Sequence, residues 1–326
     1  RSVMLHNVDA SSEPEQAEAA LREAIIQQCE VDQILPYRDG GNGISDEEES
    51  FFFGRQRELE QLLDRHRHNF MLVGPRQMGK SSLLNALSRS LRRRQPQVQV
   101  LKYQFWNGSL QTISKSDPSL RADTPEAFYR SVMERSQAHQ VFLLDEVDDF
   151  IRQERQTQYA FCNVMRALSG QERASFVLAG HQELHDAMRT PDHPLRNFGD
   201  LLRLEPLDAD SACRMVVEPL TALGLHFVDP AAALDWLLRQ TACRPHLLAQ
   251  VCAALVRWKR PLNTQPISAA DLAATALSPS LLHDAFGDWD ATEGNALLNG
   301  TVLRAALLLG PTTLHDLETF LHAQGA

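Results

Sequence analysis

From residue 51 onward, short apolar segments alternate with amphipathic helical segments. The apolar runs have the length of buried strands, and glycine or charged residues bound most of them. The predicted strands are 69–74, 97–106, 141–145, 174–180 and 201–207. The predicted helices between them are 55–66, 80–94, 124–136 and 158–170. Because strands that alternate with helices form parallel sheets covered on both faces, the expected fold class is α/β over residues 51–207.

The alternation stops after residue 207. The next stretch has helical periodicity and no convincing strand, which predicts a separate helical unit over residues 208–280. Its predicted helices are 209–222, 230–240, 245–259 and 269–277. The tail at 281–326 is also helical in pattern, with a capped helix at 311–321.

Residues 1–50 form an acidic amino-terminal segment and linker. A short strand is expected at 3–9, a helix at 11–30, and a linker rich in glycine and acidic residues at 35–50. This segment holds 3 basic and 12 acidic side chains, which leaves 29 basic and 30 acidic side chains for the rest of the chain. The net charge of −10 therefore belongs almost entirely to the first 50 residues. It does not exclude a nucleic-acid surface elsewhere.

Composition narrows the class of protein further. A chain of 326 residues with 43% apolar side chains has room for about two globular domains. No apolar run is long enough for a transmembrane helix, and no signal peptide is visible, so we expect no membrane association and a cytoplasmic location. The five scattered cysteines contain no CxxC pair and are expected to be free thiols. The chain begins with Arg1, as a fragment or a processed chain would.

The strongest chemical signal is GPRQMGKS at 74–81, which matches G-x-x-x-x-G-K-[ST] between a predicted strand and a predicted helix. Its glycines let successive N–H groups point at phosphate oxygens, and the helix that begins near Lys80 adds its positive end. Lys80 is expected to contact the β- and γ-phosphates, and Ser81 to ligate Mg²⁺. The residues expected to line the phosphate site are Gly74, Pro75, Arg76, Gln77, Met78, Gly79, Lys80, Ser81 and Ser82.

A second motif, VFLLDE at 141–146, places two acids at the end of a buried strand. Asp145 is expected to hold Mg²⁺, and Glu146 to polarise the attacking water. Asp148 and Asp149 are interpreted as surface acids. The predicted strand at 97–106 fits the P-loop branch in which an extra strand separates the two motif-bearing strands.

ATP is the expected nucleotide. A GTPase would show [NT]KxD after the strand of Asp145, whereas the nearest match, SKSD at 114–117, precedes it.

Several segments occur in the order seen in bacterial STAND/AAA-type ATPases, and residues 36–280 of the chain resemble that family. The matching segments are FFFGRQRELEQLL (51–63), NFMLVGPRQMGKSSLLNAL (69–87), VFLLDEVDDF (141–150), SFVLAGHQEL (175–184) and CRPHLLAQVCAALV (243–256). The resemblance implies a P-loop NTPase core of the ASCE/AAA-like kind, a helical lid over 208–280, and the beginning of a winged-helix-like domain at 281–326.

The same resemblance implies further site residues. Phe53, Gly54 and Arg55 would lie near the adenine, and His181 stands at the first sensor position, where the family has Asn, Ser or Thr. Arg244 would act as a second sensor with Pro245 packing on the base, although the glycine of the family's G-x-P lid motif is missing here. An arginine finger is not identifiable from the sequence; Arg189, Arg196 and Arg203 all follow the strand of the first sensor position, and Arg196 is the nearest to a candidate among them.

Two other patterns point to different chemistry. The pair of histidines in HQELH (181–185) lacks the glutamate position of zinc proteases, so zinc is not expected. The run Arg89, Arg92, Arg93 and Arg94 closes a helix, where positive charge is favourable, and nucleic-acid binding is the alternative for it.

The sequence thus predicts a slow ATPase that converts ATP and water to ADP and phosphate, with ATP/ADP and Mg²⁺ as cofactors. We expect a nucleotide-dependent switch in signalling, defence or assembly, with nucleotide-dependent self-association and an unidentified protein partner. Two alternatives stay open: a DNA-linked ATPase of the transposition or replication-regulator type, and a scaffold that binds nucleotide without hydrolysing it.

Overall fold

The computed structural model of the protein describes residues 37, 52–105, 111–117, 119–135, 138–259 and 266–276. The predicted strand at 3–9, the helices at 11–30 and 311–321, and the whole tail at 281–326 lie outside the described residues. Of the linker at 35–50, only Tyr37 is described.

The centre of the molecule is a five-stranded sheet in the order β2-β3-β4-β1-β5. Every neighbouring pair is parallel. The three middle strands consist of buried residues, which is why their sequences read as continuous apolar runs. In sheet order the strands are β2 (Gln99–Gln104), β3 (Gln140–Asp145), β4 (Ala174–Gly180), β1 (Phe70–Val73) and β5 (Asp200–Arg203).

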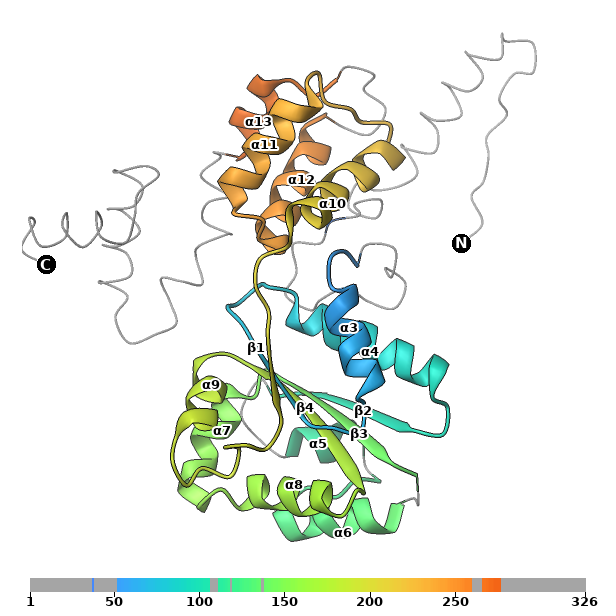
Figure 1. Ribbon diagram of the computed structural model, residues 1–326, viewed down its shortest axis with the longest axis vertical. Coiled ribbons are helices and arrows are strands. Elements are labelled where there is room, and N and C mark those ends of the chain that lie inside the picture. Colours follow the sequence, from blue (N-terminus) through green and yellow to red (C-terminus); the bar gives the residue numbers. More distant parts are fainter. Residues whose placement is uncertain are drawn as a thin grey trace, which may run out of the picture.

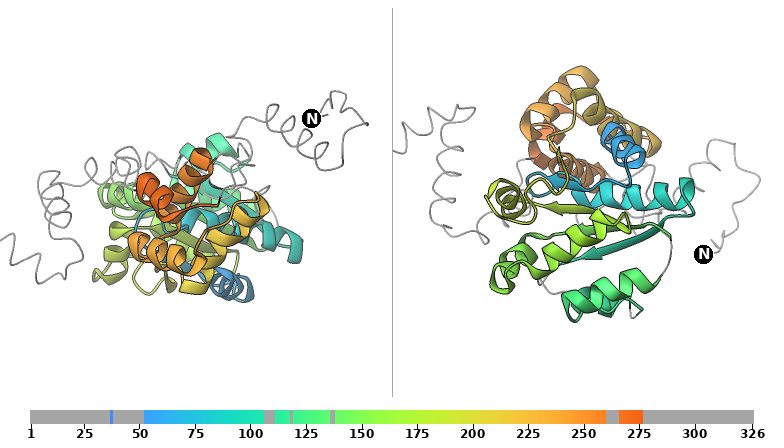
Figure 2. Two further views of the ribbon diagram at one scale, coloured as in Figure 1. Left: turned by 90° about the horizontal axis from the view of Figure 1, so that it is seen from above. Right: turned by 60° about the horizontal axis from the view of Figure 1, so that its bottom comes forward.

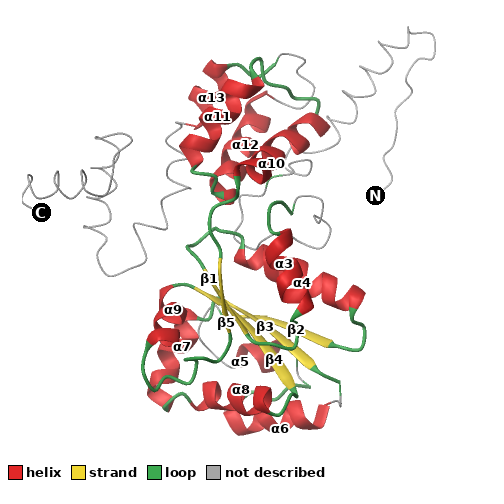
Figure 3. Ribbon diagram, viewed as in Figure 1, coloured by secondary structure: helices red, strands yellow, loops and turns green. Residues whose placement is uncertain are grey.

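Helices cover both faces of this sheet, as Figures 1 and 3 show. One face packs on α3 (Gln56–Asp64) and α4 (Lys80–Arg94) through a core that includes Leu62, Leu83 and Leu143. The other face carries a core of aromatic rings, among them the stacked pair Phe142 and Phe176. The helices on this second face are α5 (Gln111–Ser116), α6 (Pro125–Arg135), α7 (Asp148–Glu154), α8 (Ala160–Gly170) and α9 (Gln182–Arg189), with the short 3₁₀ helix η2 (Arg155–Thr157) after α7.

Four further described helices form a separate helical unit, which lies beyond one end of the strands in Figure 1 and is a compact group in Figure 2. They share a hydrophobic core of their own, centred on residues such as Val216, Leu237 and Leu255. The helices are α10 (Ala209–Ala222), α11 (Pro230–Thr241), α12 (Pro245–Lys259) and α13 (Ala269–Ala276).

Tyr37 belongs to the core of this helical unit although it precedes the sheet in sequence. Its hydroxyl lies 3.2 Å from the carbonyl oxygen of Met215 and 3.1 Å from that of Val216, both in α10. The same helix contains Pro219, which has no N–H to donate to Met215 four residues earlier. Tyr37 therefore supplies a donor to a carbonyl that the proline leaves without its helical partner.

Most predicted elements are found within a few residues of their expected bounds. Helices α4, α10 and α12 and strand β4 have the predicted bounds, and Thr124 caps α6 by accepting a hydrogen bond from the Ala127 N–H at 3.1 Å. The predicted P-loop branch is confirmed, because one strand separates β1 from β3 in the sheet. That strand is β4, however, and the segment at 97–106 expected there forms β2, an edge strand. Helices α5, α7 and α9 were not predicted.

The sheet register brings the ends of the three middle strands together. Val73 pairs with Gly180, and Leu144 pairs with Leu178, so the loops that follow β1, β3 and β4 leave the sheet side by side. We call this side, toward the helical unit, the carboxyl edge of the sheet, and the opposite side the amino edge. The carboxyl edge of an open parallel sheet is where such folds bind ligands.

Candidate nucleotide site

The loop between β1 and α4 has the backbone shape of a phosphate cradle. Gln77 and Gly79 both have positive φ, at 64° and 87°, and such left-handed residues turn successive N–H groups to one side. A Cβ placed on Gly79 would meet no atom within 4 Å, so open space lies on that side of the loop. Helix α4 begins at Lys80 and directs its positive amino end toward the same space.

Lys80 is the buried cation of this loop, with 5% of its surface exposed. Its Nζ donates hydrogen bonds to the carbonyl oxygens of Gly74 at 2.8 Å and Pro75 at 2.9 Å. Burial lowers the pKa of the Lys80 ammonium to about 8, against the opposing pull of nearby Glu146 and Asp145. The lysine is thus held where an anionic ligand would restore its full charge.

Asp145, at the end of β3, is fully buried. Its Oδ1 accepts a hydrogen bond from the Glu146 N–H at 3.1 Å, whereas its Oδ2 has no hydrogen-bond partner in the described part of the chain. Burial raises the pKa of this carboxyl, and the nearby Ser81 hydroxyl acts in the opposite direction. A buried carboxylate oxygen without a partner, beside a serine hydroxyl, fits the oxygen donors that Mg²⁺ takes in phosphate sites.

Glu146 follows in a strained conformation. Its φ is +57°, a left-handed value that costs energy for a residue with a side chain. Its carboxylate is partly exposed, and Oε2 lies 3.7 Å from Nε2 of His181. The proximity of His181 lowers the pKa of Glu146, so the carboxylate is ionised at neutral pH. In this conformation the charged Glu146 carboxylate lies near His181 at the carboxyl edge of the sheet.

His181 connects the phosphate loop with Glu146. Its Nδ1 lies 3.0 Å from the carbonyl oxygen of Gly74 and 3.2 Å from Lys80 Nζ. Its Nε2 lies 3.4 Å from Lys80 Nζ and 3.7 Å from Oε2 of Glu146. The sensor position predicted from the sequence therefore lies within reach of the lysine, the loop and the acid.

Asp148 has a different position from the one predicted. It was interpreted as a surface acid, but it is half-buried, and its carboxylate accepts three backbone hydrogen bonds. Oδ2 accepts from the His181 N–H at 2.7 Å, and Oδ1 accepts from the N–H groups of Glu183 at 2.9 Å and Leu184 at 3.3 Å. Asp149, by contrast, is paired with Arg152 on the surface. Acid spacing after a strand could not distinguish these two aspartates, because the partners of Asp148 come from α9.

The segment before α3 lies between the phosphate loop and the helical unit. The guanidinium of Arg55 is buried and donates to the carbonyl oxygens of Met78 in the loop and Glu205 after β5. Gly54 has a φ of +68°, and a Cβ there would lie 2.6 Å from Cβ of Ser211 in α10. The Phe53 ring is 5.9 Å from the guanidinium of Arg214 in the same helix. Phe53, Gly54 and Arg55 therefore lie where the phosphate loop, the connection after β5 and helix α10 meet. Their role at the adenine stays a prediction.

The remaining predicted residues are less closely connected. Arg244 and Pro245 begin α12 after a turn in which Ala242 and Cys243 both have positive φ. Among the described residues, no hydrogen bond or ion pair joins the Arg244 side chain to the phosphate loop. The backbone carbonyl of Arg196 accepts a hydrogen bond from Arg166 near the amino edge. The roles predicted for Arg244, Pro245 and Arg196 stay predictions.

Comparison with known families identifies the chain. The model of the family described as Novel STAND NTPase 1 matches residues 36–275. The chain is a member of this Novel STAND NTPase 1 family. The match spans the phosphate loop, both motif acids, the sensor strand and the helical unit. A search of the curated proteins finds no relative.

Solved structures show that this family member has the fold of P-loop ATPases. The Walker-type ATPase PABY2304 of Pyrococcus abyssi superposes with a TM-score of 0.60 at 16% identity, over 87% of each chain. The ORC1 protein of Aeropyrum pernix, solved with DNA, gives 0.55 at 16% identity over 82% of this chain and 76% of that one. Domain III of the replication initiation protein DnaA of Thermotoga maritima gives 0.52 at 15% identity over 70% and 94%. The superpositions establish a shared fold, and at identities this low they establish the fold alone.

Other kinds of site find little support in the described residues. They contain no group of three or more His, Cys, Asp or Glu that could hold a metal ion. The expectation that HQELH binds no zinc stays a prediction. Four of the five cysteines are described, and all four are free: Cys162, Cys213, Cys243 and Cys252. No described helix has the length and hydrophobicity needed to cross a membrane.

Proposed function

We propose that the chain binds ATP with Mg²⁺ at the carboxyl edge of the sheet and hydrolyses it slowly, as a nucleotide-dependent switch. The observation that carries the proposal is the convergence of Lys80, Asp145, Glu146 and His181 from three neighbouring strand ends. Lys80 has a lowered pKa, Asp145 has a buried oxygen without a hydrogen-bond partner among the described residues, and Glu146 has a positive φ. A bound nucleotide with Mg²⁺ would interact with each of these groups. The membership in a STAND NTPase family supports the same reaction class.

The proposed reaction assigns one task to each group. The backbone N–H groups of residues 76–80 and the Lys80 ammonium would bind the β- and γ-phosphates. Ser81 and Asp145 would hold Mg²⁺, which supplies charge neutralisation to the phosphate oxygens when bound. Glu146 would accept a hydrogen bond from the attacking water and orient it toward the γ-phosphorus, with ADP and inorganic phosphate as products.

The helical unit is proposed to act as the lid that reports the state of the nucleotide. Arg55 bonds to both Met78 in the phosphate loop and Glu205 in the strand-to-helix connection, so a change in the loop is passed to the residues that lead into α10. We propose core and lid boundaries at 51–207 and 208–280, with 1–50 and 281–326 as flanking segments. A lid that moves with the γ-phosphate would make self-association depend on the nucleotide.

The DNA-linked alternative rests on the arginines at the end of α4. One of them, Arg94, makes a bidentate pair with Glu60 of α3 at 3.0 and 3.1 Å, as a helix-packing contact would. We therefore favour the switch. Binding of duplex DNA that weakens with salt, and weakens further in Arg92→Ala, would instead favour the DNA-linked alternative.

Glu146→Gln is the variant that tests hydrolysis. Glutamine keeps the size of the side chain and removes the charged acceptor, so turnover of ATP should fall by at least about 100-fold, with ADP affinity retained within about threefold. Phosphate release and equilibrium binding of a fluorescent ADP measure the two quantities. Wild-type protein that binds ATP without any turnover would support the scaffold alternative, and wild-type protein that binds neither nucleotide would overturn the proposed site.

Particle mass tests the switch itself. We expect the mass of the wild-type protein, measured by light scattering, to differ between ADP and a non-hydrolysable ATP analogue. A constant monomer in both would contradict the switch and leave the nucleotide site intact.

A further inference from the structure

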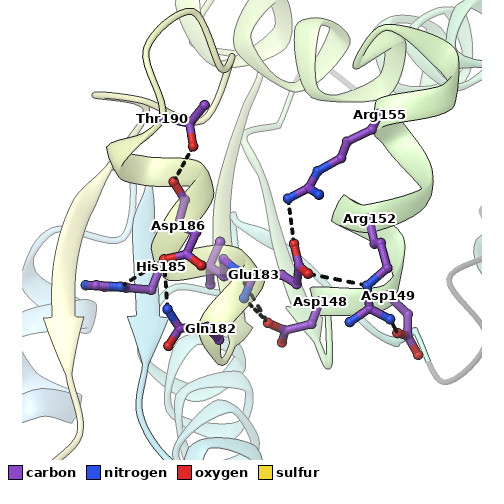
Figure 4. A network of polar contacts seen from close by, with 10 residues as sticks. Asp148, Asp149, Arg152, Arg155, Gln182, Glu183, His185, Asp186 and Thr190 are labelled. Atoms are coloured by element: carbon purple, nitrogen blue, oxygen red, sulfur yellow. Dashed lines mark hydrogen bonds and ion pairs between the residues drawn. The ribbon is translucent and has the colours of Figure 1, made fainter. Parts of the chain in front are cut away.

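Asp148 lies at the contact between two helices that follow neighbouring strands. It is the first residue of α7, immediately after the β3 turn, and its carboxylate accepts the N–H groups at the beginning of α9, after β4. Figure 4 shows this carboxylate directed at the α9 terminus. One side chain thus ties the turn that carries Glu146 to the turn that carries His181.

The fit around this carboxylate is close. A Cβ placed on Gly180 would lie 2.7 Å from Asp148 Oδ2, so only glycine leaves room for the approach. The backbone adds a parallel contact, because the N–H of Val147 donates to the carbonyl oxygen of Ala179 at 3.1 Å. The peptide group between Gly180 and His181 is therefore held in place by strand β4, which precedes it, and by the Asp148 carboxylate, which accepts its N–H.

The fixed peptide determines where the imidazole lies. Asp148 accepts from the main-chain N–H of His181, and the ring of the same residue contacts the Gly74 carbonyl, Lys80 and Glu146. His181 reaches the site from a short turn between β4 and α9, where the described residues offer the backbone no other side-chain acceptor. Loss of the acid would leave the ring free to move relative to the loop and to Glu146.

We propose that Asp148 is a positioning residue, which acts through His181 on the γ-phosphate side of the reaction and leaves the rest of the nucleotide to the phosphate loop. This inference rests on the proposed ATPase function and adds a residue to it. ADP has no γ-phosphate, so its affinity depends little on Asp148. Affinity for an ATP analogue and the rate of turnover depend on it.

The same network contains a matched control. Glu183 also joins α7 to α9, through ion pairs with Arg152 at 3.4 Å and Arg155 at 2.8 Å (Figure 4). Both arginines are more than half exposed, so these pairs contribute little to stability. Glu183→Gln removes the charge from these ion pairs and leaves one acceptor oxygen, just as Asp148→Asn does, without changing the contact to the His181 peptide.

The experiment compares Asp148→Ala, Asp148→Asn and Glu183→Gln with wild type in the full chain. For Asp148→Ala we expect ADP affinity within about threefold of wild type, and kcat at least about tenfold lower. The preference for a non-hydrolysable ATP analogue over ADP should also be lost. Asp148→Asn keeps one acceptor oxygen and should recover part of kcat, and Glu183→Gln should match wild type in all three quantities.

A second comparison separates positioning from general stability. His181→Ala and the double variant with Asp148→Ala should have the same kcat, because an acid that acts through His181 has nothing to position once the ring is gone. Losses that multiply in the double variant would show that Asp148 acts independently of His181 and would overturn the inference. Asp148→Asn provides the same comparison if Asp148→Ala does not fold.

The outcomes for the two proposals differ. Wild-type protein that binds and hydrolyses ATP, with Asp148→Ala keeping the wild-type kcat and analogue preference, overturns the inference alone. Wild-type protein that binds no nucleotide overturns the proposed function and the inference with it. A drop in ADP affinity equal to the drop in analogue affinity assigns Asp148 to folding of the site as a whole and also overturns the inference.

Discussion

The two edges of the sheet treat their buried polar groups differently. At the amino edge, Asn69 uses its whole amide: Nδ2 donates to Ser169 Oγ at 2.8 Å and to the Phe198 carbonyl at 2.9 Å, and Oδ1 accepts from the Phe176 N–H at 3.0 Å. His139 likewise bonds through both ring nitrogens, to the Glu172 carbonyl and to a serine hydroxyl, each at 3.0 Å. These groups hold strands and loops together.

At the carboxyl edge, three charged groups are less well accommodated. Asp145 has an oxygen without a partner, Lys80 has a lowered pKa, and Glu146 has a positive φ. The amino edge has exceptions among the described residues: Gln140 Oε1 lacks a hydrogen-bond partner but belongs to an uncharged amide, and Asp200 Oδ2 lacks one but is ion-paired with Arg65 at 2.7 Å. The contrast teaches that polar groups with partners here contribute stability, whereas the charged groups at the carboxyl edge support the proposed binding site.

Lys80→Ala, at the carboxyl edge, should give the largest loss of nucleotide affinity with little loss of stability. It removes the cation that we propose contacts the phosphates, so we expect ADP and ATP affinity to fall by at least about 100-fold, beyond detection in a titration of the fluorescent nucleotide. The free energy of unfolding without nucleotide should not fall by more than about 1 kcal/mol, because the lost charge is a buried one. Unchanged ADP affinity would refute the assignment of the loop.

Asn69→Ala should show the opposite behaviour at the amino edge. It leaves the Phe176 N–H and the Phe198 carbonyl without partners in a buried place, which costs about 2–3 kcal/mol in unfolding free energy. ADP affinity should stay within about twofold of wild type. Urea denaturation and nucleotide titration check the two statements. A loss of ADP affinity would break the division between the edges.

The smallest expected effect concerns pH. The folded protein without nucleotide holds Lys80 at a pKa of about 8, against 10.5 as the ordinary value, so between these pH values the unfolded chain binds a proton that the folded chain does not. Stability therefore rises with pH over this interval. Relative to Lys80→Met, wild type should gain about 1–2 kcal/mol between about pH 7 and about pH 10. An equal pH dependence in both proteins would show that the lysine is not desolvated.

The sequence was most informative where one pattern determines one feature. Helix periodicity defined α4, α10 and α12, and the GPRQMGKS motif between strand and helix defined the phosphate loop. The buried run before Asp145 also placed that acid at the carboxyl edge. In each case the signal is local, because the residues that produce the feature are neighbours in the chain.

Features that depend on distant partners were missed. Helix α7 has only Phe150, Ile151 and Glu154 buried among many charged residues, which is too little periodicity to predict seven helical residues. The order of strands follows from packing, so the position of β4 between β1 and β3 could not be obtained from the order of segments along the chain. Asp148 was taken for a surface acid because its three donors lie more than 30 residues away.

The hydrogen bonding of the Tyr37 hydroxyl to carbonyl oxygens of α10 has a practical consequence for work with this protein. A version that starts at residue 52 would keep every described strand and the whole phosphate loop, but the Met215 carbonyl in α10 would lose the hydroxyl donor that compensates for Pro219. Proteolysis between residues 37 and 52 would have a similar result once the tyrosine dissociated. The shortest piece with the stability of the full sequence should therefore begin before Tyr37, well upstream of α3.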